Sequence, residues 1–283
     1  MIRPKGQAMT YERLNETALE YFPCRYGLSK MLFRGPRRKL EGSFCAILGG
    51  TETYGKFIPT PYPALLENFC GVPAVNFGCV HAGLDVYLND PAVLEACVKA
   101  RVTLVQMTGA QNTSNRYYSV HPRRNDRVLK VSTLLMAIYR EVDFEQFQTV
   151  SEMLCALNAS SPERFTIIVE EIRAAWVARM KMLLQKTEGK TVLLWMARHS
   201  PDDVVHMPIL GAEPLFINRA MVETIRPFAT ELVEVVASIP ARAEGVAGMV
   251  FQPSDAPEAN ALLGPAVHTE VAEALAPVVA ALV

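Results

Sequence analysis

The amino-acid sequence predicts an α/β fold with three layers, α/β/α, in which a mostly parallel sheet lies between helices. Short apolar runs alternate with helical patterns along the chain, and this alternation is typical of βαβ units. The length of 283 residues suits one large domain or two small ones, and no clear linker divides the chain. The expected strands cover residues 43–49, 72–77, 102–108, 190–197 and 230–237.

Helix signals separate these strands. One helix is expected from Pro63 and another from Pro91, where Asp90 is a good N-cap and proline suits the first helical position. The last helix is expected to begin near Gly264 and Pro265. Its buried side is predicted to consist of apolar residues at helical spacing, namely Val267, Val271, Ala274, Val278 and Leu282.

Two segments are expected to add to this core. Residues 1–42 predict a helical and basic extension, with a helix that Thr10 caps, and residues 43–283 predict the α/β domain itself. Residues 129–187 contain strong helix formers, so they predict an almost purely helical insertion whose apolar stripe includes Trp176 as a core residue. The stretch between them, 109–128, is interpreted as a long polar loop, which indicates a function.

Charge and cysteine usage exclude several classes of protein. The net charge of −1 argues against bulk affinity for nucleic acid. No stretch has the pattern of a signal peptide or of a transmembrane span. The six cysteines show no C-x-x-C spacing, and most lie in apolar runs where a thiol behaves as a small hydrophobe. We therefore expect a reduced, cytoplasmic protein without a structural zinc ion.

One loop, residues 49–56, allows two chemical interpretations. From Gly50 it spells G-x-x-x-x-G-K, which is close to a phosphate-binding loop. A phosphate-binding loop needs a hydroxyl residue after the lysine and then a helix, but Lys56 is followed by Phe57. Prolines at 59, 61 and 63 also prevent a helix from starting there, so this interpretation is disfavoured.

From Gly49 the same loop spells G-x-T-x-T-x-G, which resembles the nucleophile turn of the GDSL/SGNH hydrolases, with Thr51 in place of the serine. Three further blocks resemble this family in the same order, at 62–67, 75–83 and 109–112. The resemblance covers residues 43–115 well and the C-terminus loosely. The segment 116–127 is also similar to an uncharacterised group of bacterial proteins.

The resemblance implies an SGNH-like or flavodoxin-like sheet and a set of catalytic roles. Thr51 is expected to be the nucleophile or a substrate-positioning hydroxyl, although its methyl group crowds the approach. The oxyanion is expected to be stabilised by amides of Gly78 or Gly83 and of Gln111 or Asn112. His268 is expected to be the base, although no D-x-x-H motif precedes the last helix. Asp255 and Glu258 lie upstream as possible orienting carboxylates.

Other histidines leave alternatives open. His81 follows the second strand and can face the same crevice. For His268 the alternative is a structural histidine at a helix start, hydrogen-bonded to backbone or water and without a catalytic role. His199 and His206 flank Asp202 and Asp203 with a spacing that suits a metal. Prolines around them indicate an irregular loop, so no metal ion is expected.

Basic residues predict an anionic substrate. A first cluster between Arg25 and Lys39 is interpreted as a solvated face. A second cluster continues a loop of the crevice, and arginine forks recognise carboxylate, phosphate and sulfate. The residues expected to bind substrate are Arg116, Tyr117, His121, Arg123 and Arg124.

The function expected from the sequence is hydrolysis or transfer of an ester or acyl group on an anionic or carbohydrate substrate. No bound cofactor is expected, although coenzyme A is a possible acyl donor, and sulfuryl transfer to a polysaccharide precursor is a further possibility. The alternative is a non-catalytic carbohydrate-binding or assembly protein on a hydrolase scaffold. The sequence makes no prediction about the oligomeric state.

Overall fold

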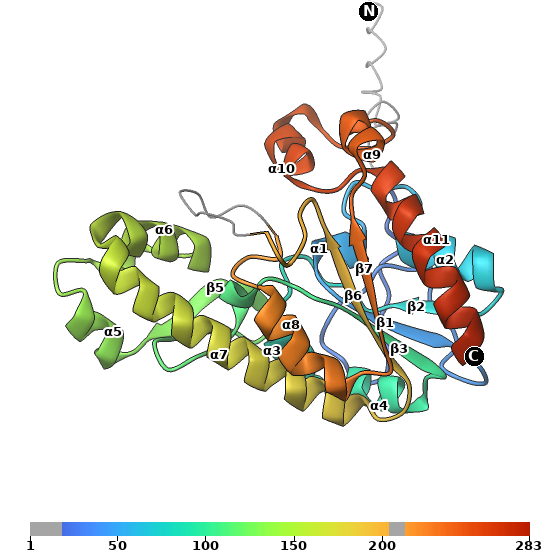
Figure 1. Cartoon of the computed structure of the whole chain (residues 1–283), viewed down its shortest axis with the longest axis horizontal. Helices are drawn as coiled ribbons and strands as arrows, with labels where there is room; N and C mark the ends of the chain where they lie inside the picture. The colour runs from blue at the N-terminus through green and yellow to red at the C-terminus, as the bar shows by residue number, and fades with distance from the viewer. Residues whose placement is uncertain (1–18, 204–212) are drawn as a thin grey trace, which may run out of the picture.

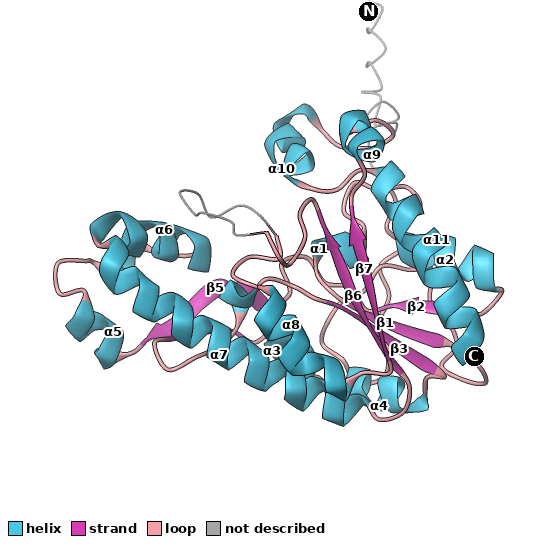
Figure 2. Cartoon of the chain, viewed as in Figure 1, coloured by secondary structure: helices cyan, strands magenta, loops and turns pink. Residues whose placement is uncertain are grey.

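The central sheet has five strands, all parallel, in the order β2-β1-β3-β6-β7 (Figures 1 and 2). The structure, a computed structural model, describes residues 19–203 and 213–283. The strands are β1 (Cys45–Leu48), β2 (Ala74–Asn76), β3 (Val102–Gln106), β6 (Thr191–Ala197) and β7 (Glu231–Val236). Each lies within a range that the sequence predicts, so the α/β fold class is confirmed. Counting only these strands gives 2-1-3-4-5, the flavodoxin-like order.

Helices cover both faces of the sheet because neighbouring residues of each strand point to opposite sides. In β1, Ala46 and Leu48 face one apolar core, while Cys45 and Ile47 face the other. The first core is covered by α3 (Leu84–Leu88), α4 (Pro91–Lys99), α7 (Pro162–Thr187) and α8 (Arg219–Ile225). The second is covered by α2 (Tyr62–Cys70), α9 (Ile239–Glu244) and α11 (Pro265–Leu282). Two short helices, α1 (Thr51–Tyr54) and α10 (Ala256–Ala261), lie at the carboxyl ends of the strands.

The start of α4 agrees with its sequence signal. The Asp90 side chain accepts hydrogen bonds from the backbone N–H groups of Ala92 and Val93, at 3.1 and 3.3 Å, and Pro91 occupies the first helical position. Asp90 also accepts a bond from the Ser29 hydroxyl at 2.5 Å. This cap therefore fixes part of the N-terminal segment as well as the helix.

The N-terminal segment differs from the expected helical extension. Residues 19–42 contain no helix and instead form a bridge between Cys24 and Phe33. Phe33 is fully buried, and its ring packs edge-on against Phe77 at 5.1 Å. Burial of this aromatic residue against Phe77, just after β2, fixes the segment to the domain. Thr10 and most of the helix expected to follow it lie outside the described residues.

The region 109–131 also differs from the sequence prediction. The expected polar loop contains a hairpin of β4 (Tyr118–His121) and β5 (Arg124–Val131), which runs into the segment expected to be helical. Polar and β-branched residues share these strands, so their apolar alternation is weak. Helices α5 (Thr133–Ile138), α6 (Val150–Ser160) and α7 follow.

Residues 139–149 are not α-helical, which differs from the expected continuous helical insertion. Helix α6 begins after this stretch, where Thr149 and Glu152 form a capping box. Helices α5, α6 and the start of α7 form an arm that projects beyond the sheet (Figure 1). The division of the chain into an extension, a domain and an insertion stays a prediction. In the described residues, none of the helices combines the length and apolarity that a membrane crossing requires.

Trp176 fastens the long helix α7 to the sheet. It is fully buried, as the sequence predicts for a core residue. Its indole Nε1–H donates to the carbonyl oxygen of Thr108 at 3.0 Å, just after β3 ends. The same side chain therefore fills the core and sets where the chain leaves β3.

We predict that Trp176→Phe destabilises the fold, because it leaves a cavity and a buried carbonyl without its donor. The unpaired carbonyl alone costs about 1–3 kcal/mol, and the cavity adds to this loss. Urea unfolding followed by circular dichroism measures the change. Ile167→Ala, an exposed position of the same helix, is the control and should change stability by less than about 0.5 kcal/mol. Equal midpoints for the two variants would contradict the anchoring role.

Candidate functional site

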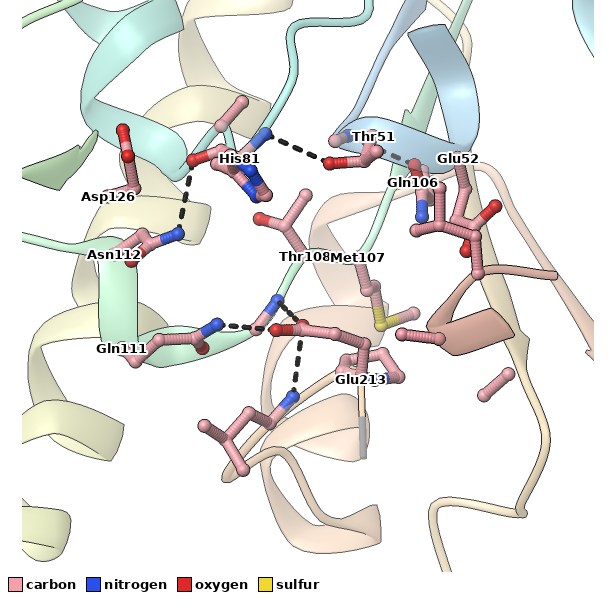
Figure 3. A pocket seen from close by; sticks show the side chains of 18 of the residues that line it. Thr51, Glu52, His81, Gln106, Met107, Thr108, Gln111, Asn112, Asp126 and Glu213 are labelled. Atoms are coloured by element: carbon pink, nitrogen blue, oxygen red, sulfur yellow. Dashed lines mark hydrogen bonds between the residues drawn. The ribbon is translucent and has the colours of Figure 1, made fainter. Parts of the chain in front are cut away.

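A cavity of about 770 Å³ opens at the carboxyl ends of β1, β3 and β6. Gly50 and Thr51 follow β1, Thr108 and Gly109 follow β3, and all four line its wall. In this strand order the chain continues from β1 toward one edge of the sheet, at β2, and from β3 toward the other edge, at β6 and β7. The crevice between β1 and β3 is the place where open parallel sheets bind ligands. Figure 3 shows the side chains of Thr51, His81, Thr108 and Glu213 around one space.

The turn after β1 is held by one side chain of β3. The Oε1 atom of Gln106 accepts bonds from Gly50 N at 3.0 Å, Thr53 N at 3.3 Å and Thr53 Oγ1 at 2.6 Å. A side chain at position 49 does not fit here, because a Cβ on Gly49 would lie 2.0 Å from Thr53 Oγ1 and 2.5 Å from Gln106 Oε1. The first glycine of the motif thus allows the turn to approach β3.

The structure excludes a phosphate-binding loop at this position. Helix α1 begins at Thr51 and ends at Tyr54, and the next helix, α2, begins only at Tyr62, so no helix starts directly after Lys56. Lys56 Nζ instead lies 2.5 Å from Oε2 of Glu258 in α10. The prediction that the prolines at 59, 61 and 63 prevent a helix from starting at Lys56 is therefore confirmed.

Thr51 and His81 lie together on the cavity wall. Thr51 Oγ1 accepts a bond from the backbone N–H of His81 at 3.0 Å, so the threonine hydroxyl is free to direct its own proton elsewhere. His81 has a φ of +56°, a conformation that a non-glycine residue rarely adopts and that often marks functional sites. Its Nε2 atom lies 3.8 Å from Oε1 of Glu258, and Asn112 Nδ2 donates to its carbonyl oxygen at 3.1 Å.

His268, the base expected from the sequence, is fully buried behind this wall. Its Nδ1 atom accepts a bond from the backbone N–H of Tyr62 at 3.1 Å, so a neutral ring carries its proton on Nε2. That Nε2 lies 3.6 Å from Oε2 of Glu52, whose other oxygen accepts from Leu263 N at 3.0 Å. Glu52 lines the cavity, whereas His268 does not.

The carboxylates expected to orient His268 lie elsewhere. Asp255 ends a short 3₁₀ turn, where its backbone N–H donates to the Gln252 carbonyl at 2.8 Å. Glu258 contacts Lys56 and His81 instead. The residue that faces His268 is Glu52, which the sequence shows only as the neighbour of Thr51.

The expected oxyanion donors are already engaged. The single amide protons of Gly78 and Gly83 are donated to Asn76 Oδ1 at 2.8 Å and Asn125 Oδ1 at 2.9 Å, respectively. Gln111 Nε2 donates to Glu213 at 2.5 Å. The structure therefore differs from the expectation for the two glycines, while the side-chain amides of Gln111 and Asn112 line the cavity with a second proton each.

Glu213 is a cavity residue that no sequence signal singled out. Its Oε2 atom accepts bonds from Gly109 N at 3.1 Å and Leu215 N at 3.3 Å, and its Oε1 atom accepts from Gln111. The residue as a whole is exposed, but both carboxylate oxygens accept hydrogen bonds from these donors. Burial raises the pKa of the Glu213 carboxyl above its ordinary value, and the hydrogen bonds and the charge of His81 offset this only partly.

The expected substrate-binding residues separate into two groups. Arg116 pairs with Glu171 at 2.8 Å and lies over the ring of Tyr117, which is itself buried. His121, Arg123 and Arg124 instead line a second hollow next to His81. The five residues are close together in the sequence, but the β4–β5 hairpin places them on different surfaces of the domain.

The metal interpretation finds no support in the described residues. Asp202 pairs with Arg219 at 2.8 Å, and these hydrogen bonds lower the pKa of its carboxyl. His199 lies at the cavity with its ring edge-on to Trp195, while His206 lies outside the described residues. Across 19–203 and 213–283, no group of three or more metal-ligating side chains is assembled.

Residues 9–283, which include the whole cavity wall, match the family model described as a domain of unknown function, DUF6473. The chain belongs to this family. No curated protein sequence matches it. The lipase Lip_vut3 from a goat rumen metagenome is similar in structure, with 11% identity and a TM-score of 0.40 over 83% of this chain and 96% of the lipase.

A second solved structure has 15% identity and a TM-score of 0.38, covering 84% of this chain and 98% of its own. Structural likeness of this size carries no argument about activity. The functional assignment of this DUF6473 member therefore depends on its own cavity.

We predict that Glu213 makes the stability depend on pH. Because the folded state raises its pKa, it binds the proton more tightly than the unfolded chain. Its contribution is therefore fully present below the ordinary value of 4.5 and is lost as the pH rises through the folded pKa.

The test is urea unfolding of wild type and Glu213→Gln between pH 4.5 and 8. Gln111 can flip to receive the new amide, since its Oε1 atom is buried without a partner. Relative to the variant, wild type should lose stability with rising pH. Glu244→Gln, at an exposed position, should run parallel to wild type. A constant difference between wild type and Glu213→Gln would refute the raised pKa.

Proposed function

We propose that this protein is an enzyme that hydrolyses or transfers an ester or acyl group, with the Thr51 hydroxyl as its reacting or substrate-positioning group. The observation that carries the proposal is one stretch of cavity wall. It holds the Thr51 hydroxyl, the imidazole of His81 and the carboxylate of Glu258 at the ligand-binding end of the sheet. A hydroxyl, an imidazole and a carboxylate are the groups that nucleophilic acyl chemistry uses in sequence.

His81 is the base in this proposal. Its backbone N–H holds Thr51 Oγ1, which brings the two residues side by side, and its imidazole reaches the cavity. Glu258 lies beside Nε2 and stabilises the imidazolium that forms when the ring takes a proton. Lys56 fixes the other oxygen of Glu258. The base is thus supported from a distant part of the chain.

His268 has a positioning role. Because its ring is fully buried and its Nδ1 atom accepts a bond from Tyr62 N, it positions the start of α2 behind the cavity wall. This arrangement supports moving the base from His268 to His81. The Glu52 carboxyl group, next to Thr51 in the sequence, accepts its bond from Leu263 N.

Glu213 and Asn112 supply the remaining chemistry. The raised pKa of the Glu213 carboxyl means that it holds a proton more readily than an ordinary glutamate, and in this proposal it donates that proton to a leaving group. Asn112 keeps one amide proton for a developing oxyanion, because its other proton is donated to His81. The cavity volume suits a small-molecule substrate.

The alternative is a binding protein without catalysis. The glycine amides already donated to Asn76 and Asn125 favour it, because a preformed oxyanion hole needs free donors. The two functions differ in whether removal of the Thr51 hydroxyl changes turnover.

We predict that Thr51→Val lowers kcat/KM for p-nitrophenyl acetate by about 100-fold or more, since valine keeps the shape but lacks the hydroxyl. Thr51→Ser is the matched control and should stay within about tenfold of wild type because it keeps the hydroxyl. Glycerol added as an acceptor distinguishes transfer from hydrolysis. Absence of turnover in all three proteins would favour the binding protein.

We predict opposite consequences for the two histidines. His81→Gln should lower kcat/KM by about 10²–10⁴-fold, the usual contribution of a general base, with little change in Tm. His268→Gln should lower Tm because it removes a fully buried ring that accepts a bond from Tyr62 N. Activity that falls more in His268→Gln than in His81→Gln, at temperatures where both are folded, would return the base to His268.

A further inference from the structure

A second hollow, of about 520 Å³, collects basic side chains from two distant parts of the sequence. Arg25 and Lys30 come from the N-terminal segment, and Arg123 and Arg124 come from the β4–β5 hairpin. His81 and His121 complete the polar lining, with Asp126 as its carboxylate. The first basic cluster, interpreted from sequence as a solvated face, is therefore partly joined to the second.

The four cations of this hollow have no acidic partner among the described residues. Neighbouring basic residues differ in this respect: Arg38 pairs with Glu67, Arg116 with Glu171, and Arg127 with Asp126. Arg25, Lys30, Arg123 and Arg124 are all exposed. Unpaired like charges held close together repel one another, so a hollow that gathers them is relieved by an anion.

Buried polar contacts hold both basic segments in position. Asn125, fully buried, accepts bonds from Gly83 N at 2.9 Å and Val86 N at 3.1 Å, and it donates to the His121 carbonyl at 3.0 Å. These bonds fasten the hairpin tip to the loop that carries His81. On the other side, the bond from Ser29 to Asp90 fastens the segment that carries Arg25 and Lys30. The cations are thus presented by fixed backbone.

The hollow also adjoins the reaction site. His81 and Asp126 line both the hollow and the larger cavity. A ligand whose charged end lies among the four cations therefore extends past His81 toward Thr51. This geometry suits a substrate with a charged anchor at one end and a reacting group at the other.

We propose that this hollow binds the diphosphate group of a small-molecule substrate or donor, with Arg25, Lys30, Arg123 and Arg124 as its ligands. The hollow is lined by four cationic side chains and one carboxylate, so its positive charge suits an anion that carries more than one negative charge. The guanidinium group of arginine binds two phosphate oxygens at once. The identity of this end as part of the substrate rests on the proposed function. Anion binding itself does not.

Isothermal titration calorimetry with inorganic pyrophosphate tests the proposal at low and moderate salt. Wild type should bind, and the double variants Arg123→Ala/Arg124→Ala and Arg25→Ala/Lys30→Ala should each bind at least about tenfold more weakly. Arg101→Ala/Lys186→Ala removes two exposed cations elsewhere and should bind as wild type does. Loss of affinity in this control, or equal affinity in all variants, would overturn the proposal.

Further probes identify the source and class of the anion. If ADP binds and the four cations determine its affinity, the result supports an organic diphosphate as the ligand. If pyrophosphate binds but ADP does not, the proposal that the hollow binds the diphosphate end of a substrate is overturned. Orthophosphate binding as tightly as pyrophosphate overturns the diphosphate assignment. A single-stranded DNA oligonucleotide that binds more tightly through the same residues overturns the small-molecule ligand.

Thr51→Val separates this proposal from the proposed function. It should bind pyrophosphate as wild type does, because Thr51 does not line the hollow. If esterase activity is absent but the four cations still determine pyrophosphate affinity, the proposed function fails and the anion site stands. Weakened pyrophosphate binding in folded Thr51→Val would show that the anion occupies the larger cavity and overturn the assignment.

Discussion

Three hydrogen bonds to the side-chain oxygen of Gln106 hold the chain where it leaves β1, and the geometry of the cavity depends on them. Gln106 belongs to β3, so its contact ties the turn to the neighbouring strand rather than to its own. A buried amide oxygen that lacks hydrogen-bond donors lowers the stability of the fold. Gln106 therefore stabilises the turn only while Gly50 and Thr53 supply their donors. Thr51 takes its position at the start of α1 because Gly50 and Thr53, on either side of it, are fixed.

Three of the carboxylates that line the cavity have different surroundings. Glu52 faces the ring of a buried histidine, Glu258 lies between Lys56 and His81, and Glu213 is held by backbone and side-chain amides. Burial raises the pKa of the Glu213 carboxyl above its ordinary value. Side chains of one type on one wall thus have different partners, and the sequence alone does not distinguish them.

The strands were predictable because their apolar runs are short and bounded by turns, and the turn after β1 was predictable because glycines follow such a run. The hairpin at 118–131 was missed, since its residues show little apolar alternation. Gln106 and Glu213 were not predictable as site residues, because their roles come from contacts with residues distant in sequence or irregular in structure. The position of His268 near the last helix was anticipated, but its complete burial behind Glu52 depends on how α11 packs against α2.

Asn125 has a consequence that reaches beyond its own hairpin. One buried amide connects the loop of His81 with the tip that carries Arg123 and Arg124. The loop of His81 on the cavity wall and the hairpin side of the basic hollow are therefore held against each other by the same side chain. A member of the family with a different hairpin would have to keep the Asn125 amide, or else change both the loop of His81 and the hairpin tip. Variation is therefore easiest in the side chains that project from the tip, while the backbone beneath them stays constant.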